Sequence, residues 1–318
     1  MDLIYEANDA HGKPMQKRLF PSINENTESY TYHSDLGLLS ATQFTQPAII
    51  IMEMAIVADL RARQLISPTS SFAGHSLGEY AALINLVEIM PKETAVCIGF
   101  YRGLMMQNSV ERDQDGRSQF SMCAVDPSRV CKGFSGDELT ELVADIATQT
   151  GCLLEVVNFN VEDQQYVCAG DLRALSCLGS VLDQVNAQAA SGAVVEMDVL
   201  VRKCADRARR LPKTLKLARG KATIPLNGID VPFHSSYLSN GVEAFRNRLY
   251  SSIPKDTLEP KTLVGKYIPN LTGKTFEISR SYFEHVLSLT DSAPIKRVLS
   301  MVCASSYRQV SLIVTGIY

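Results

Sequence analysis

A serine between two glycines is the clearest candidate for chemistry in this sequence. Ser76 is the centre of Gly74-His75-Ser76-Leu77-Gly78, which follows a short apolar run and precedes an apolar helical pattern. Such a motif between a strand and a helix is typical of a nucleophile elbow, where the glycines permit a sharp turn. The amide of Leu77 would then stabilise the oxyanion of a tetrahedral intermediate. Because turns rich in glycine and serine are common, the pentapeptide alone leaves a purely structural turn open.

A nucleophilic serine needs a base, because its hydroxyl is barely ionised at neutral pH. The sequence offers five histidines: His11, His33, His75, His234 and His285. His75 adjoins the serine, so we expect it to pack beneath the turn at the cleft. His11 and His33 lie in a polar segment and His285 in a helical one, where surface or capping roles are commoner. His234 is therefore predicted as the base, with a loop histidine bonded to the backbone as the alternative.

Arg102 is the one charged residue in the run from Val96 to Met106. A buried guanidinium requires an anionic or strongly polar partner. An ion pair with an acid such as Glu79 would be structural, whereas bidentate binding of a substrate carboxylate would be functional. The residues alone leave these two readings equal.

The elements that would position these residues alternate between helix and strand. Apolar spacing predicts a buried helix over 41–63, a short strand over 71–74 and helices over 77–90 and 91–107. Further along, strand-like residues 222–229 precede a helix over 237–250, and 266–273 reads as a strand that ends in a loop. The order around Ser76 is thus strand, sharp turn, helix.

Residues 118–197 follow a different pattern, with strands over 120–125, 153–159, 165–169 and 193–197 and helices over 136–148 and 172–188. That order is the βαββαβ unit. We therefore predict an α/β fold with an α/β-hydrolase-like core that has a parallel sheet (36–117 and 222–318) and an inserted ferredoxin-like subdomain (118–197). A polar segment (1–35) precedes the core. A basic connector (198–221) is expected to be a solvated linker, with a docking patch for an acidic carrier as the alternative.

Composition excludes several classes of protein. The net charge of −3 over 318 residues argues against a nucleic-acid partner, and 46% hydrophobic with 20% charged residues is ordinary for a globular protein. Eight cysteines without a Cys-x-x-Cys pair predict reduced core thiols, a cytoplasmic location and no metal site. The apolar stretch Pro47–Leu60 contains Glu53 and Asp59 and is short for a bilayer, so we expect no membrane segment. No secretory signal is visible at the start of the sequence.

The serine, arginine and histidine in this order resemble the malonyl-CoA:carrier-protein transacylase family. More closely, the sequence is similar to the malonyl/palmitoyl transferase domain of the fungal fatty acid synthase β subunit. The resemblance spans about residues 36–295, and it rests on seven blocks: Leu38–Ala48, Phe72–Leu83, Phe100–Gly103, Glu155–Glu162, Gln164–Val167, Val231–Ser235 and Lys266–Thr272.

The resemblance implies a ping-pong transfer in fatty acid biosynthesis. Ser76 would attack an acyl-CoA thioester with His234 as base, and the acyl group would pass to the phosphopantetheine thiol of acyl carrier protein. Arg102 would bind the malonyl carboxylate, while a long-chain acyl group such as palmitoyl would make no use of it. Other residues expected to line the cleft are Gln46, His75, Asn160, Phe233 and Asn270. No bound cofactor is expected, and the synthase α subunit and the rest of the β subunit are the expected partners.

Two departures from the family pattern carry expectations of their own. The family opens with a strand that ends in Gly-Gln-Gly and helps to build the oxyanion hole, and the sequence shows none, so we expect an N-terminally truncated domain. Gln46 belongs to a different block and does not replace it. The apolar tail from about Leu299 to Tyr318 lies outside the resemblance. The competing hypotheses are a serine hydrolase or thioesterase and an inactive assembly fragment of a synthase.

Overall fold

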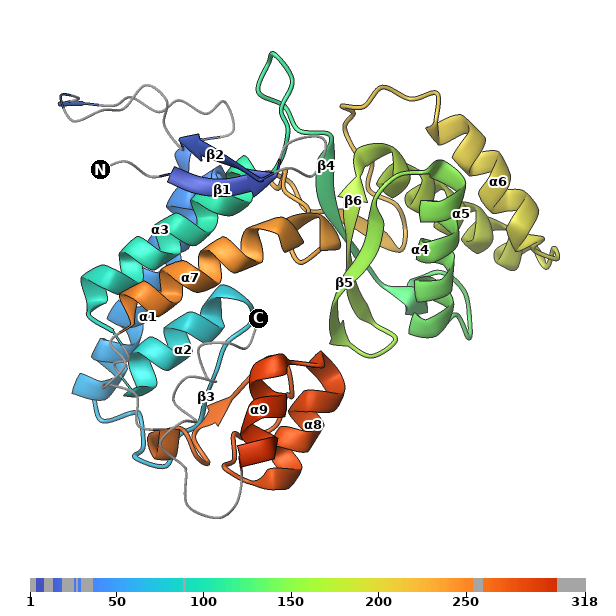
Figure 1. The fold of residues 1–318 in the computed structure, drawn as a ribbon. Helices are drawn as coiled ribbons and strands as arrows, with labels where there is room; N and C mark the ends of the chain where they lie inside the picture. Colours follow the sequence, from blue (N-terminus) through green and yellow to red (C-terminus); the bar gives the residue numbers. More distant parts are fainter. Residues whose placement is uncertain are drawn as a thin grey trace. The chain divides into compact units, whose positions relative to one another are not determined.

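The computed structural model describes residues 4–8, 14–18, 26, 28–29, 37–87, 90–253 and 260–301. The chain divides into two compact units (Figure 1), one of Met1–Met105 with Gly241–Tyr318 and one of Met106–Asn240. The second unit extends beyond the predicted subdomain 118–197 at both ends. It takes in the basic connector and the loop that carries His234.

The first unit places one short parallel strand pair among helices. Strand β3 (Phe72–Ala73) pairs in parallel with β8 (Tyr267–Ile268), which confirms the strands expected within 71–74 and 266–273. The other described elements are α1 (Thr42–Ala62), α2 (Leu77–Val87), α3 (Lys92–Asn108), α7 (Val242–Ser252), α8 (Arg280–Thr290), α9 (Ala293–Met301) and the 3₁₀ turns η1 (Leu38–Ser40) and η4 (Pro260–Thr262). The expected helices over 41–63, 77–90 and 91–107 are thus present with small shifts at their ends.

A hairpin near the start of the chain was not expected from the sequence. Strands β1 (Ile4–Asn8) and β2 (Pro14–Arg18) pair antiparallel, with Glu6 opposite Gln16. The sequence analysis placed only a polar segment here. Two five-residue strands of mixed polarity give too weak an alternation for a pattern to stand out.

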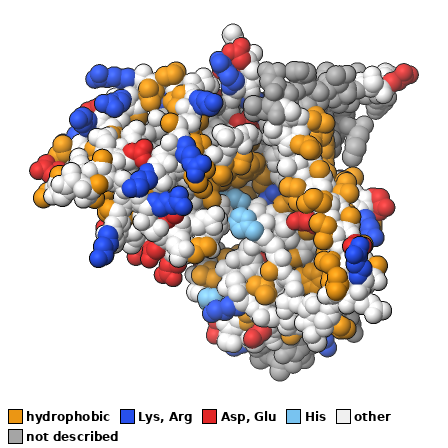
Figure 2. Space-filling view, turned by 180° about the vertical axis from the view of Figure 1, so that it is seen from behind, with side chains coloured by type: hydrophobic (Ala, Val, Ile, Leu, Met, Phe, Trp, Pro, Cys, Tyr) orange, Lys and Arg blue, Asp and Glu red, His pale blue; other side chains and the backbone are white. Residues whose placement is uncertain are grey.

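Helix α1 is less buried than its composition predicted. Its buried residues, Thr42, Gln43, Gln46 and Ile50, lie in its first half, whereas Ile51, Met52 and Ile56 are 51%, 54% and 51% exposed. The expectation of a buried helix is wrong for this second half, because residues that are apolar all round a helix do not tell which sides are covered. Hydrophobic side chains reach the surface at several places in Figure 2.

By length and composition alone, α1 is also the one helix within the described ranges that could cross a membrane. A single helix of this kind is weak evidence, since core helices of soluble proteins pass the same test. Glu53, Asp59 and Arg61 on this helix would each be costly inside a bilayer. The expectation of no membrane segment therefore stays a prediction.

The second unit is built on a four-stranded antiparallel sheet of order β5-β6-β4-β7. Figure 1 labels β5, β6 and β4 of this sheet. Its elements are β4 (Phe120–Val125), the 3₁₀ turn η2 (Pro127–Arg129), α4 (Gly136–Thr150), β5 (Leu154–Val161), β6 (Gln165–Asp171), α5 (Leu172–Ser191), α6 (Met197–Ala208), β7 (Thr223–Pro225) and the 3₁₀ turn η3 (Ser236–Gly241). The fourth strand of the expected βαββαβ order is β7, next to β4, and the strand expected over 193–197 is absent. Val194 there is 88% exposed. In a run this short, the spacing of apolar residues does not distinguish a strand from a loop that connects two helices.

The basic connector is helical over its first half, which corrects the expectation of a solvated linker. Helix α6 buries Leu200, Val201, Cys204, Ala205 and Ala208 and packs on α4 and α5. Its basic side chains lie on the exposed side of the helix. The run of charges concealed an apolar stripe at helical spacing, because the two occupy different faces of the same helix.

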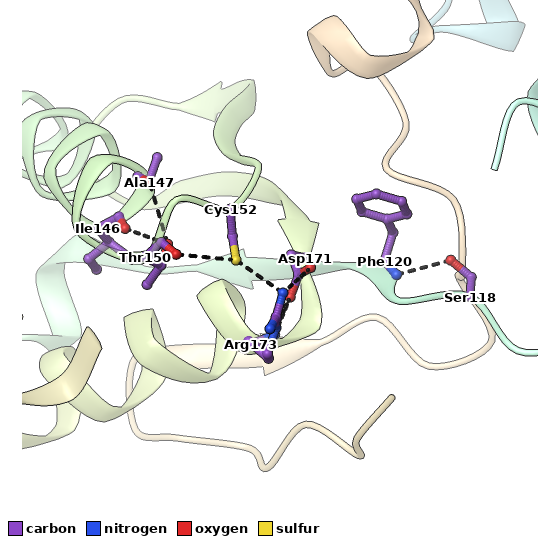
Figure 3. Close-up of polar contacts among 8 residues, drawn as sticks. All are labelled: Ser118, Phe120, Ile146, Ala147, Thr150, Cys152, Asp171 and Arg173. Atoms are coloured by element: carbon purple, nitrogen blue, oxygen red, sulfur yellow. Dashed lines mark hydrogen bonds and ion pairs between the residues drawn. The ribbon is translucent and has the colours of Figure 1, made fainter. Parts of the chain in front are cut away.

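Polar contacts fix the ends of the helices in this unit (Figure 3). The Asp171 side chain accepts from the backbone amide of Arg173 and caps α5, and it also forms an ion pair with the Arg173 guanidinium at 3.2 Å. Arg173 also contacts Cys152 Sγ at 3.5 Å, just after the last residue of α4, Thr150. Capping of this kind contributes about 1 kcal/mol per helix end. These contacts keep α4 and α5 seated on the sheet.

Candidate active site

The turn that carries Ser76 has the backbone of a nucleophile elbow. Ser76 joins β3 to α2 and has a φ of 53°, in the left-handed region that non-glycine residues seldom adopt. The amide of Gly78 donates to the His75 carbonyl at 2.9 Å, and the amide of Glu79 donates to the Ser76 carbonyl at 3.2 Å. The serine is thus held in a tight, strained turn at the start of a helix.

Leu77 is the first residue of α2, and its side chain is buried. The first amides of a helix have no carbonyl partner within the helix and carry the positive end of its dipole. The Leu77 amide therefore has the chemistry expected of an oxyanion donor next to Ser76.

Arg102 lies beside the serine. It projects from α3 and is 9% exposed. Its Nη1 donates to Gln46 Oε1 at 2.8 Å and its Nη2 to Ser76 Oγ at 3.2 Å. The guanidinium also lies over the Tyr80 ring, 5.5 Å from its centroid. Burial raises the pKa of Tyr80 to about 12, although the nearby charge of Arg102 acts in the opposite direction.

Glu79, considered above as an ion-pair partner for Arg102, is held elsewhere. Its carboxylate accepts hydrogen bonds from the Tyr267 hydroxyl, from the Asn270 amide at 3.1 Å and from Asn270 Nδ2 at 3.0 Å. These bonds tie α2 to β8 and to the loop that follows it. Asn270 is thus found near the elbow, but its side chain points to Glu79.

His234 belongs to the second unit, where it occupies an exposed turn. Its φ is 64°, also in the left-handed region. The turn is fixed by Ser235 Oγ, which donates to the Pro232 carbonyl at 2.7 Å, and by the Ser236 amide, which donates to Glu155 Oε2 at 2.8 Å. The pairing of Ser76 with His234 stays a prediction.

Two other residues expected at the cleft also lie in the second unit. Phe233 is half-buried and packs against the sheet residues Met122 and Val167, while Asn160 is exposed near the end of β5. Their place in a cleft is untested, as is the pairing above.

The other histidines differ in their exposure to solvent and in whether the structure describes them. His75 is exposed, so the expectation that it packs beneath the turn is wrong. Adjacent residues of a sharp turn project in different directions, and His75 projects to the surface. His285 is half-buried on α8, and His11 and His33 lie outside the described residues.

The structure thus brings together Ser76, Leu77, Gln46 and Arg102 in one unit, adds Tyr80, which the sequence analysis did not place there, and gives Glu79 other partners than the one considered. Tyr80 underlies the guanidinium, and Glu79 anchors the elbow helix. Both follow the serine by one helical turn, and an aromatic residue four positions after a helix-starting nucleophile was the signal that could have found Tyr80.

Comparison with known proteins identifies relatives that match most of the chain. Residues 4–294 match the acyl transferase domain family. The fatty acid synthase subunit beta of Gibberella zeae is 51% identical over 302 residues, which is 94% of this chain and 15% of that protein. The fatty acid synthase subunit beta of Saccharomyces cerevisiae is 46% identical over 301 residues, 91% of this chain and 15% of that protein. The chain therefore spans about 15% of the length of these curated relatives.

Solved structures share the fold. FabD from Acinetobacter baumannii gives a TM-score of 0.51 at 23% identity, covering 79% of this chain and 62% of that one. The malonyl-CoA:acyl carrier protein transacylase from Helicobacter pylori gives the same TM-score and identity, covering 81% and 64%. The expected α/β class, with a parallel strand pair and an antiparallel sheet, is confirmed.

Proposed function

Because the chain belongs to the acyl transferase domain family, we propose that it moves malonyl and long-chain acyl groups between coenzyme A and acyl carrier protein. The reaction would serve fatty acid biosynthesis, and palmitoyl is the long-chain group we expect. The observation that carries the proposal is the 3.2 Å contact between Arg102 Nη2 and Ser76 Oγ. A buried positive charge one hydrogen bond from a nucleophile suits an acyl group that ends in a carboxylate.

In the proposed mechanism the transfer takes place in two half-reactions. Ser76 Oγ attacks the thioester carbonyl while His234 takes the hydroxyl proton, and the Leu77 amide stabilises the oxyanion. The carbon–sulfur bond then breaks, and the coenzyme A thiolate leaves with the proton from His234. In the second half, His234 takes the proton of the phosphopantetheine thiol and the thiolate attacks the carbonyl carbon of the acyl-serine ester. The ester carbon–oxygen bond then breaks, and Ser76 Oγ takes the proton back from His234.

Arg102 would discriminate between acyl groups by charge. In a malonyl-serine ester the free carboxylate is only two carbons from the ester carbonyl, so it falls within reach of a guanidinium that already contacts the serine oxygen. A charge-assisted pair with arginine adds affinity and orientation. A palmitoyl chain offers no such partner and would bind through its apolar surface.

The wider setting belongs to the same proposal. Acyl carrier protein supplies the phosphopantetheine thiol, and coenzyme A thioesters are substrates, so no bound cofactor is needed. The synthase α subunit and the rest of the β subunit are proposed as assembly partners in the cytoplasm. The finer architecture we propose is an α/β-hydrolase-like core with a ferredoxin-like subdomain. The sheet order β5-β6-β4-β7 supports the ferredoxin-like part of this proposal.

Radiolabelled malonyl-CoA tests the proposal directly. The longest native polypeptide that contains this chain is incubated with labelled malonyl-CoA and carrier protein, and the Ser76 peptide is analysed by mass spectrometry. Label on Ser76 that passes to the carrier thiol is the expected result, and Ser76→Ala should remove both signals. Free malonate without acyl-carrier product would indicate a hydrolase. A chain never acylated at Ser76 would indicate an inactive assembly fragment.

A further inference from the structure

The contacts of Arg102 share one property: all of them are uncharged. Gln46 offers an amide oxygen at 2.8 Å, Ser76 a hydroxyl oxygen at 3.2 Å and Tyr80 the face of its ring. Among the described residues, no carboxylate lies within ion-pair distance of Arg102. A guanidinium that is 9% exposed and has only neutral partners keeps its full charge for a ligand.

From this arrangement we infer that Gln46 is a specificity-determining residue, which anchors Arg102 without neutralising it. The inference rests on the proposed function and names the residue that lets Arg102 select acyl groups bearing a carboxylate. The established family role of acyl transfer does not by itself require a neutral residue at this place.

The orientation of the Gln46 amide is determined by its neighbours. Arginine has donors only, so the amide must face Arg102 with its oxygen. Its nitrogen in turn donates to Thr42 Oγ1 at 2.9 Å, one helical turn earlier. Gln46 is itself 5% exposed, so water does not compete for these bonds. The chain Thr42, Gln46, Arg102, Ser76 is thus a line of hydrogen bonds from α1 to the nucleophile.

The nearest acid on the elbow helix is kept occupied. Glu79 follows Ser76 by three residues, but its carboxylate accepts bonds from Tyr267 and Asn270. These donors compensate the buried carboxylate, so it has no need of the guanidinium. The neutral anchor and the occupied acid act together to leave the Arg102 charge unpaired.

A one-atom change tests the role of neutrality. Gln46→Glu keeps the size and the acceptor oxygen but places a carboxylate against Arg102, which would pair with it and repel a substrate carboxylate. Malonyl-CoA and acetyl-CoA are compared, because they differ by the carboxylate, and acylation of Ser76 is measured in single turnovers. We expect the malonyl:acetyl rate ratio to fall by about 10- to 100-fold, the equivalent of one hydrogen bond to a charged group. Acetyl loading serves as the reference in each variant, so that a general loss of activity cancels in the ratio.

A matched control distinguishes the effect of a negative charge beside Arg102 from the effect of a negative charge elsewhere on the same helix. Ala48→Glu adds the same charge to the same helix at an exposed position. Its ratio should equal that of the wild type, and a fall as large as that of Gln46→Glu would overturn the inference. An unchanged ratio in Gln46→Glu would overturn it as well.

A second variant covers the case in which Gln46→Glu does not fold. Gln46→Met removes the anchor without adding charge, and the loosened guanidinium should lower the ratio by about tenfold. No change in this variant would mean that Gln46 does not position Arg102. If wild-type Ser76 accepts neither acyl group, the proposed function itself fails, whereas a wild type that prefers malonyl with unaffected variants refutes only the role of Gln46.

Discussion

The carbonyl oxygen of Gly78 occupies the place where a side chain on Gly74 would begin: an ideal Cβ on Gly74 would lie 2.0 Å from it. The corresponding Cβ on Gly78 would meet nothing nearer than Glu53 Oε1 at 3.9 Å. The two glycines of the motif are therefore unequal. Position 74 requires glycine, because the backbone of Gly78 approaches it closely. Position 78 lies in helix α2, where alanine fits.

We expect Gly74→Ala to destabilise the protein by about 3 kcal/mol or more, because the clash is with backbone that cannot move aside. Gly78→Ala is the matched control and should be neutral or stabilising by up to about 1 kcal/mol, since alanine favours a helix. Chemical denaturation of both variants checks this. Equal losses would mean that the elbow is not as tight as described.

Arg102→Ala should reduce malonyl loading of Ser76 by about 100-fold while palmitoyl loading changes little, because a charge-assisted contact exists only with the carboxylate. Arg248→Ala is the control, since Arg248 also lies over an aromatic ring, Tyr101, at 5.5 Å but makes no recorded contact with Ser76. The measurement is the rate of Ser76 acylation by malonyl-CoA and by palmitoyl-CoA in each variant. Equal losses for both acyl groups would show that the arginine is structural.

His234→Ala should slow loading of malonyl and palmitoyl groups alike by about 10²- to 10⁴-fold, the usual contribution of a general base. The measurement is the pre-steady-state rate of Ser76 acylation as a function of pH. In the wild type the rate should rise as an imidazole loses its proton, and this rise should be missing in the variant. A variant that keeps the wild-type profile would place the base elsewhere.

Cysteine reactivity should follow burial. Cys97 is exposed, which corrects the expectation that all the cysteines are core thiols, whereas Cys123, Cys168 and Cys177 are buried. Burial raises the pKa of Cys123 and of Cys177 to about 12 and that of Cys168 well above its usual value. Because the thiolate is the nucleophile, iodoacetamide at pH 8 should alkylate Cys97 before Cys123, Cys168 and Cys177 and leave these three unmodified. Alkylation of the three at comparable rates in the folded protein would contradict the described core.

The sequence was sufficient for the local order around Ser76. Helical spacing after residue 77 and the glycine at position 74 predicted strand, turn and helix, and the structure has β3, the elbow and α2 in that order. Local patterns succeed here because backbone geometry and apolar spacing act within a few residues.

The sequence did not predict which residues that are far apart in the chain lie in contact. The polar partner of Arg102 proved to be Gln46, which is 56 residues away, and the donors to Glu79 come from the other end of the chain. Such contacts depend on how the helices pack against one another, and the spacing of residues within one helix does not predict that packing. Helix α6 was missed for a different reason, since its five charged residues are as many as the five apolar residues that it buries and alternate with them along the sequence.

The bonds from Asn270 to Glu79 have a consequence for the order in which the protein forms. They join residues 191 positions apart. Glu79, which accepts them, lies in the first turn of α2, the helix that begins beside Ser76. Contacts of this range form late, because a long loop must close first. During synthesis, the nucleophile can reach its final geometry only after residue 270 has left the ribosome. A nascent chain therefore carries its serine long before it could use it.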